Sequence, residues 1–297
     1  MEVPDEVYEV DGDTGASVRD PEARPPADAP EVPEDTTPDP AVEEPPAEPV
    51  LDPPPAEDCD HTSDLVYLIG RDDHALYLFD PPTLSINRLG VLDCNTFASP
   101  ASMAVARDGL AYVRYSDQSI KEVDLDTLRC RDTGYNDRRT AFGGFGMGFS
   151  ADAAGGWRET LYVANISEIA SLDTSSWQLD RFGSVASQSE LTGTADGELW
   201  TFLPLERPAI LAQVDKQTGA RVRTMRLTNF PNPTDIDAFA FAAWGGSFWL
   251  FVREYGMGSS TDIYRVDPGP TMVLVSEDIG VDIVGAGVST CAPTVAP

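Results

Sequence analysis

Residues 75–83 read Ala-Leu-Tyr-Leu-Phe-Asp-Pro-Pro-Thr, an alternating strand pattern that ends in an aspartate and a turn. The same pattern recurs along the chain, with Thr or Ser near the third turn position in four copies and Pro in the last. The five copies are Phe79–Thr83, Val123–Thr127, Leu172–Ser176, Val214–Thr218 and Val266–Pro270. Since an aspartate in such a turn accepts hydrogen bonds from its own backbone, each copy predicts a β-hairpin.

Two further motifs recur in step with these hairpins. An aromatic residue lies inside an apolar strand upstream of each hairpin, at Tyr67, Tyr112, Tyr162, Trp200 and Trp249. A strand with small residues at alternate positions has five copies, Met103–Ala106, Met147–Ser150, Thr192–Ala195, Phe239–Ala242 and Ala286–Ser289. Alternate residues share one face of a strand, so small side chains suit a place where neighbouring sheets converge.

Each repeat therefore holds four strands in about 47 residues, a period typical of propeller blades. We predict an all-β fold, a five-bladed β-propeller of four-stranded blades, over residues 59–297. The last small-residue strand, Ala286–Ser289, has almost no chain after it, and the first aromatic strand has no small-residue strand before it. We expect the C-terminal strand to become the innermost strand of blade one and to close the ring. The alternative is an open sandwich or two small β domains.

The amino-acid sequences of the repeats also resemble those of a known group of proteins. Val-Asp-Leu-Asp-Thr from Val123 and Val-Asp-Lys-Gln-Thr-Gly from Val214, each with a Leu-Tyr-Val or Leu-Trp-Thr strand upstream, resemble the repeats of YVTN and quinoprotein-like β-propellers. The resemblance covers residues 60–292 at the level of repeat pattern. It implies the propeller fold, and export is common in those families. It implies no cofactor-binding residue, because a fold does not carry a function with it.

Charge and proline are concentrated at the N-terminal end. The chain of 297 residues has 50 acidic and 20 basic residues, a formal net charge of −30. Residues 1–58 combine many of the acidic residues and prolines with a single aromatic residue, Tyr8. We predict that they form a disordered acidic Pro-rich linker, because such a segment cannot bury enough apolar surface to offset its ordering entropy. The net charge also argues against a nucleic-acid partner, since phosphate binding needs clustered Lys and Arg.

The N-terminal sequence bears on localisation. Acidic residues follow Met1 directly, without the basic and apolar regions of a secretory signal, and there is no apolar run of 18 residues. A long acidic proline-rich segment ahead of a β domain is nevertheless typical of exported proteins held away from a membrane. We therefore expect a secreted or lipoprotein-type extracytoplasmic protein whose signal or anchor lies upstream of this sequence. A cytoplasmic protein with an acidic tail is the alternative.

The four cysteines allow three disulfide connectivities. In the propeller, Cys59 precedes the first strand of the folded region and Cys291 ends the last, so both belong to blade one. Cys94 follows the outer strand of blade one, and Cys130 lies in the outer strand of blade two. We predict the disulfides Cys59–Cys291 and Cys94–Cys130. A zinc site is the alternative, but no Cys-x-x-Cys pair is present.

Candidate binding residues come from the loops that gather at one face of a propeller. These loops join the second strand to the third or lead into the innermost strand, and they would place carboxylates around the channel mouth with arginines farther out. The candidates are Arg71, Asp73, His74, Arg114, Tyr115, Glu190, Asp235, Asp237, Arg253, Tyr255 and Asp282. They predict a site for a polar ligand or a cation. Alternatively, they are ordinary surface ion pairs of an acidic protein.

Two functions from different classes remain open at this point. The first is a tethered, exported, non-catalytic binding or scaffold module for an unknown protein or polar ligand. The second is a metal-dependent hydrolase or lactonase that uses the acidic mouth with a divalent cation. The first is favoured, because the sequence lacks a Gly-x-Ser-x-Gly elbow, a P-loop and a His-Glu-x-x-His motif. We expect a monomer without a resident cofactor and without catalytic residues.

Overall fold

The computed structural model describes residue 59 and residues 65–135, 140–256, 260–269 and 271–296. Residues 1–58, for which the sequence predicts a linker, lie outside the described residues. The chain divides into the units Met1–Val50 and Leu51–Pro297, and the second unit holds all the strands described below. No helix among the described residues is long and apolar enough to span a membrane.

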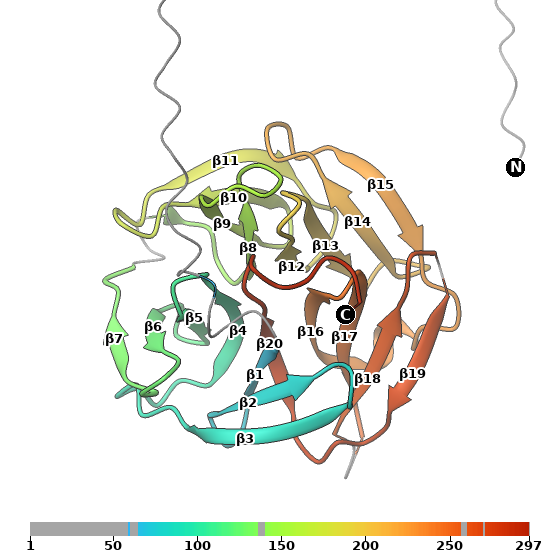
Figure 1. Cartoon of the computed structure of the whole chain (residues 1–297), viewed down its shortest axis with the longest axis horizontal. Helices are drawn as coiled ribbons and strands as arrows, with labels where there is room; N and C mark the ends of the chain where they lie inside the picture. Colours follow the sequence, from blue (N-terminus) through green and yellow to red (C-terminus); the bar gives the residue numbers. More distant parts are fainter. Residues whose placement is uncertain (1–58, 60–64, 136–139, 257–259, 270, 297) are drawn as a thin grey trace, which may run out of the picture. The chain divides into compact units, whose positions relative to one another are not determined.

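Five four-stranded antiparallel sheets form the blades of a propeller, as predicted (Figure 1). Blade one contains β1 (Val66–Gly70), β2 (Ala75–Asp80), β3 (Ser85–Val91) and the C-terminal β20 (Ile283–Gly287). Blade two contains β4 (Pro100–Val105), β5 (Leu110–Tyr115), β6 (Ile120–Asp124) and β7 (Cys130–Asp132). Blade three contains β8 (Gly146–Ala151), β9 (Glu159–Ala164), β10 (Glu168–Leu172) and β11 (Leu179–Ser184). Blade four contains β12 (Glu190–Gly193), β13 (Leu199–Leu203), β14 (Ile210–Val214) and β15 (Arg221–Arg226). Blade five contains β16 (Ile236–Trp244), β17 (Ser247–Glu254), β18 (Thr261–Val266) and β19 (Met272–Ser276).

The ring closes through its last strand. β20 pairs antiparallel with β1, with Tyr67 opposite Gly287 and Leu68 opposite Ala286. The sheet order β20-β1-β2-β3 therefore confirms that the C-terminal strand supplies the innermost strand of blade one. Closure pairs an edge that would otherwise expose unsatisfied backbone groups.

Both predicted disulfides are present. Cys59 is bonded to Cys291, 232 residues away, and ties residue 59 to the closing end of the ring. Cys94 is bonded to Cys130, which joins the exit of blade one to the outer strand of blade two. With four cysteines in the sequence, these two bonds leave no free thiol.

The small residues of the innermost strands are needed because the blades converge there. A Cβ atom added to Gly148 would lie 2.7 Å from the carbonyl carbon of Leu191 in the next blade. One added to Gly193 would overlap the backbone of Phe149 and Ser150. Only a residue without a side chain allows the strands to approach this closely.

The aspartate turns behave as predicted in most repeats. Asp124 accepts hydrogen bonds from the backbone N–H and the hydroxyl of Thr127, both at 2.8 Å, and Asp215 does the same with Thr218. Asp267 differs, because it pairs instead with the Ser247 hydroxyl at 2.8 Å and with Arg265. The turn after Asp267 reads Pro-Gly-Pro and so lacks the hydroxyl that the other turns supply.

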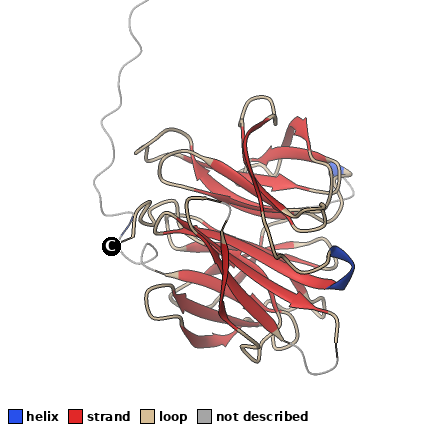
Figure 2. Cartoon of the chain, turned by 90° about the vertical axis from the view of Figure 1, so that its right-hand side faces the viewer, coloured by secondary structure: helices blue, strands red, loops and turns tan. Residues whose placement is uncertain are grey.

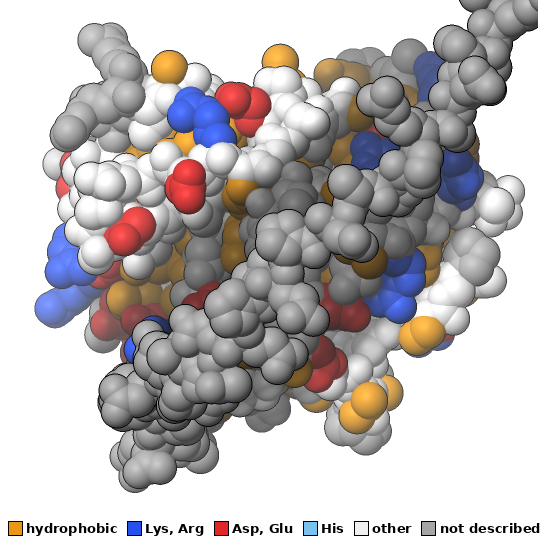
Figure 3. Space-filling model, turned by 90° about the horizontal axis from the view of Figure 1, so that it is seen from above, with side chains coloured by type: hydrophobic (Ala, Val, Ile, Leu, Met, Phe, Trp, Pro, Cys, Tyr) orange, Lys and Arg blue, Asp and Glu red, His pale blue; other side chains and the backbone are white. Residues whose placement is uncertain are grey.

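The two faces of the ring, one at each end of its axis, carry different structural elements. Figure 2 shows the helical turns on one face and the C-terminus on the opposite one. The helical turn of Pro233–Asp235 (η2) leads into the innermost strand β16 and so marks the face with the channel mouth. On the outer side seen in Figure 3, acidic and basic side chains are interspersed, as expected for exposed ion pairs.

Candidate functional site: the pocket at the channel mouth

A cavity of about 450 Å³ opens on the face that carries η2. Five of the sequence candidates line it, and they come from four blades: Arg71, Arg114, Glu190, Asp237 and Tyr255. Ala101, Gln188, Thr234, Phe239 and Val284 are among its other lining residues. The volume falls within the range of about 300–1,000 Å³ usual for small-molecule pockets.

Glu190 is the most deeply buried acid of this pocket. It begins β12, its residue is 6 % exposed, and its Oε2 accepts a hydrogen bond from the Ser102 hydroxyl at 2.9 Å. The same hydroxyl accepts a bond from the backbone N–H of Met147 at 3.2 Å. Burial raises the pKa of Glu190 to about 8, although the Ser102 bond and the charge of Arg114 act in the opposite direction. The carboxyl is therefore mostly neutral at pH 7 and can donate a hydrogen bond as well as accept one.

Arg114 lies inside the protein rather than in an outer loop. It belongs to β5, is 7 % exposed, and its Nε donates to the Phe145 carbonyl at 2.7 Å. Its terminal nitrogens donate to the Tyr115 and Ala101 carbonyls, both at 3.4 Å. The guanidinium also lies 5.4 Å from the centroid of the Phe145 ring. Arg114 thus joins blade two to blade three while it lines the mouth.

Asp237 is held between two arginines. Its Oδ2 pairs with Arg71 Nη1 at 2.9 Å and also with Arg253 Nη1. Arg253 Nε in turn lies 2.8 Å from Asp282 Oδ1. The side chains of Asp237, Asp282 and Arg253 are between 15 % and 17 % exposed, so this network is more sheltered than a surface ion pair. It ties blade one to blade five at one side of the mouth.

The remaining candidates do not line the cavity. Asp73 accepts a hydrogen bond from the Tyr77 hydroxyl at 2.6 Å and pairs with Arg88 at 3.5 Å, while His74 follows it in the same turn. Tyr115 is fully buried, and burial raises its pKa to about 12. Asp235 ends η2, and its carbonyl accepts a bond from the Tyr255 N–H at 2.7 Å. Asp73, His74, Tyr115 and Asp235 are not among the lining residues, and Arg253 and Asp282 reach the cavity only through Asp237.

Sequence reasoning missed Ser102 as part of the site. Ser102 is fully buried in β4 and holds both Glu190 and the backbone of β8. The strand register shifts between Pro100 and Ser102, where β4 pairs with β5. The repeat pattern carries no signal for this irregularity, so position alone could not distinguish Ser102 from an ordinary core residue.

The carboxylates of the mouth do not form a metal centre in this arrangement. Asp237 is neutralised by two guanidinium groups, and Glu190 is bonded to a hydroxyl. Among the residues that the structure describes, no group of three or more His, Cys, Asp or Glu side chains is placed to hold a metal ion. The geometry suits hydrogen bonding to a polar molecule better than coordination of a divalent cation.

Comparison with known proteins gives no family. No family model and no curated protein matches the sequence. Similar solved structures include a protein of unknown function from Bacteroides caccae, with 11 % identity, a TM-score of 0.40, and coverage of 76 % of this chain and 98 % of that one. A chain of the mitotic checkpoint complex has 11 % identity and a TM-score of 0.41, over 77 % of this chain and 79 % of that one. An auxiliary nutrient binding protein from Bacteroides thetaiotaomicron has 9 % identity and a TM-score of 0.41, over 71 % and 54 %. Similarity at this level carries no information about function, and the fold rests on the strand pairings described above.

Proposed function

We propose that this protein is a non-catalytic, extracytoplasmic binding module that takes a small polar ligand in the pocket at the channel mouth. The observation that carries the proposal is the convergence of Arg71, Arg114, Glu190 and Asp237, from four blades, on one cavity of about 450 Å³. Neutral Glu190 supplies both a donor and an acceptor, and Tyr255, which is 67 % exposed, offers an aromatic surface at the rim. Ion pairs fix Arg71 and Asp237, and hydrogen bonds fix Arg114 and Glu190, so these four groups lose little ordering entropy when a ligand enters.

The extracytoplasmic part of the proposal is supported by the cysteines. All four are used in two disulfides, which persist in oxidising compartments and are rare in the cytosol. The repeats resemble YVTN and quinoprotein-like propellers, which are often exported, and the acidic proline-rich sequence before Cys59 suits a tether. We propose that the protein acts as a monomer held at a surface through an anchor upstream of this sequence.

The hydrolase alternative gains no support from the site. Such an enzyme needs carboxylates free to bind a cation or to activate water, whereas Asp237 is occupied by Arg71 and Arg253.

The test is a thermal-shift panel of small polar compounds on the full chain, covering amino acids, neutral sugars, dicarboxylates and polyamines. The matched variants are Arg71→Ala, which removes a lining side chain, and Arg88→Ala, which removes an arginine of the same blade that does not line the cavity. At least one compound should stabilise the native chain and Arg88→Ala but not Arg71→Ala. The proposal fails if no compound discriminates in this way, or if the chain hydrolyses lactones or esters with an activity that EDTA abolishes.

A further inference from the structure

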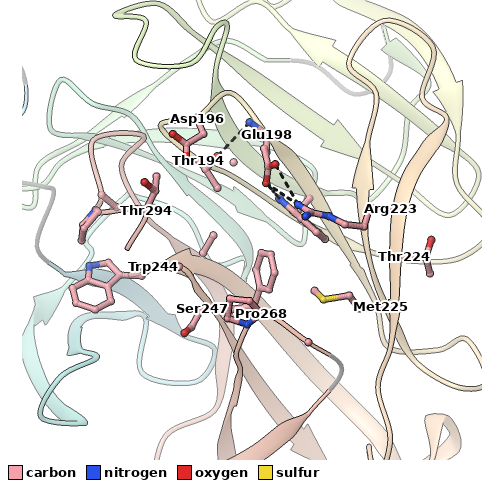
Figure 4. A pocket seen from close by; sticks show the side chains of 18 residues that line it. Thr194, Asp196, Glu198, Arg223, Thr224, Met225, Trp244, Ser247, Pro268 and Thr294 are labelled. Atoms are coloured by element: carbon pink, nitrogen blue, oxygen red, sulfur yellow. Dashed lines mark hydrogen bonds and ion pairs between the residues drawn. The ribbon is translucent and has the colours of Figure 1, made fainter. Parts of the chain in front are cut away.

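A second cavity, of about 500 Å³, lies on the opposite face of the ring, between blades four and five (Figure 4). Its walls come from the turns β12–β13 and β16–β17, the outer strand β15, and the segment after Cys291. The lining residues that matter here are Trp200, Met225, Trp244, Phe248, Pro268 and Pro293. β12 runs from Glu190, which lines the mouth pocket, to Gly193, which lines this cavity. The two cavities therefore lie at opposite ends of this innermost strand.

The aromatic wall is held rigidly. The indole N–H of Trp200 donates to Glu198 Oε2 at 2.8 Å, and the Arg223 guanidinium lies 4.7 Å from the centroid of the Trp200 ring. The Phe248 ring packs against the same indole with centroids 4.6 Å apart. Trp200 is 2 % exposed and is therefore covered on several sides, whereas Phe248 is only partly buried and presents to a ligand a ring that is already ordered.

The C-terminal wall is also fixed. The backbone N–H of Gly245 donates to the Pro293 carbonyl at 2.7 Å, and Cys291, two residues earlier, is bonded to Cys59. Figure 4 shows Trp244 and Thr294 at one side of the cavity and Met225 and Thr224 at the other. The cavity is thus bounded by elements that strand pairing, a hydrogen bond and a disulfide hold in place.

The charged side chains around this cavity are either paired with each other or exposed to solvent. Arg223 pairs with Glu198 at 3.2 Å, and the same carboxylate already accepts the Trp200 N–H (Figure 4). Asp196 is exposed at the rim, where water solvates it. A charged ligand would lose its hydration against tryptophan, phenylalanine and proline without gaining an unpaired partner in the depth of the cavity.

We propose that this cavity is a second binding site, for an uncharged molecule with a flat apolar ring system. Ring contact with the partly exposed Phe248, Pro268 and Pro293 and the release of water from these apolar walls supply the affinity. The proposal is independent of the polar site at the mouth, because none of its residues lines that pocket.

The experiment compares three naphthalene derivatives that share a ring and differ in charge. 2-Naphthol is uncharged, 2-naphthoate is an anion and 2-naphthylmethylammonium is a cation at pH 7. Binding to the full chain is followed by calorimetric titration and by the change in tryptophan fluorescence. We expect saturable binding of 2-naphthol at least tenfold tighter than that of either charged analogue.

Two matched variants locate the binding. Met225→Lys places a charge in the cavity wall, whereas Met272→Lys places one on the outer strand of the neighbouring blade, outside the lining. Both methionines are partly buried and pack against the same core cluster, so their structural costs are comparable. Met225→Lys should weaken 2-naphthol binding at least tenfold, and Met272→Lys should leave it within twofold.

Several results would overturn the proposal. They are the absence of saturable 2-naphthol binding, equal or tighter binding of a charged analogue, and equal weakening by both lysine variants in folded protein. Displacement of 2-naphthol by a peptide with the sequence of residues 48–58 would also overturn it, in favour of a proline-rich occupant.

Discussion

Replacing Glu190 by glutamine removes one titratable group from the floor of the mouth and leaves the shape of the side chain nearly unchanged. The Glu190 pKa is 4.5 when the group is unperturbed and about 8 in the folded protein. Between these values the folded chain holds a proton that the unfolded chain has released. Native stability must therefore fall as pH rises through this window, by about 1.4 kcal/mol per pH unit from this group.

The Glu190→Gln variant lacks this contribution, so the difference between variant and native chain isolates it. Well below pH 4.5, the two proteins should have similar stability, since the carboxyl is then neutral in both the folded and the unfolded chain. By pH 8 the variant should be more stable by about 5 kcal/mol, a change of roughly 10–20 °C in melting temperature for a domain of this size. Above about pH 9 the difference should stay constant, since the carboxyl is then ionised in both the folded and the unfolded chain.

The assay is urea denaturation of both proteins at half-unit pH steps from 4.5 to 9, followed by tryptophan fluorescence. A difference in unfolding free energy that grows with pH and levels off by about pH 9 supports a neutral, buried Glu190. A difference that does not vary with pH would refute the reasoning, because Glu190 would then be ionised in the fold and paired with Arg114. A variant that loses stability relative to the native chain as pH rises would refute it as well.

Three further predictions concern the scaffold. Gly193→Leu should destabilise the fold by about 1–3 kcal/mol or more in urea, because its side chain would overlap the backbone of the neighbouring innermost strand. Asp237→Ala should lower the free energy of unfolding by about 2–3 kcal/mol, because it leaves two sheltered guanidinium groups without this partner. Glu122→Ala should lower it by less than about 1 kcal/mol, because its partner Arg131 is 74 % exposed. Equal effects of these two substitutions would contradict the assignment of Asp237 as a bridge between blades. On the chain-entropy model, replacing both Cys59 and Cys291 by serine should lower the free energy of unfolding by about 5 kcal/mol. Replacing both Cys94 and Cys130 by serine should lower it by about 4 kcal/mol. Urea denaturation without reductant measures both changes.

The architecture was predictable because it is repeated. Five copies of a capped turn, an aromatic strand and a small-residue strand define the blade, and the position of Ala286 after the last blade indicates how the ring closes. The same topology brought the correct cysteines together, since each pair lies at a junction that the strand order defines. Periodic patterns carry this information because strand pairing and turn chemistry are local.

The site was only partly predictable, because side-chain partners depend on exact register and packing. Loop position correctly placed Arg71 and Asp237 at the mouth, but it could not show that they bind each other. It also grouped Arg114 with the outer arginines, whereas the structure buries Arg114 against three backbone carbonyls. The cavity between blades four and five had no sequence signal, because Trp200 and Phe248 look like ordinary core residues of their strands.

The central claim, that the mouth pocket is the polar binding site, is tested most directly by amide hydrogen exchange. The full chain is measured with and without the polar compound that gives the largest thermal shift. We predict slower exchange at Ala101 and Ser102, at Ser189 and Glu190, and across residues 234–239, with no change in the turn of residues 194–198 on the opposite face. Protection confined to residues 194–198, or spread evenly over the ring, would contradict the assignment of the mouth as the binding site.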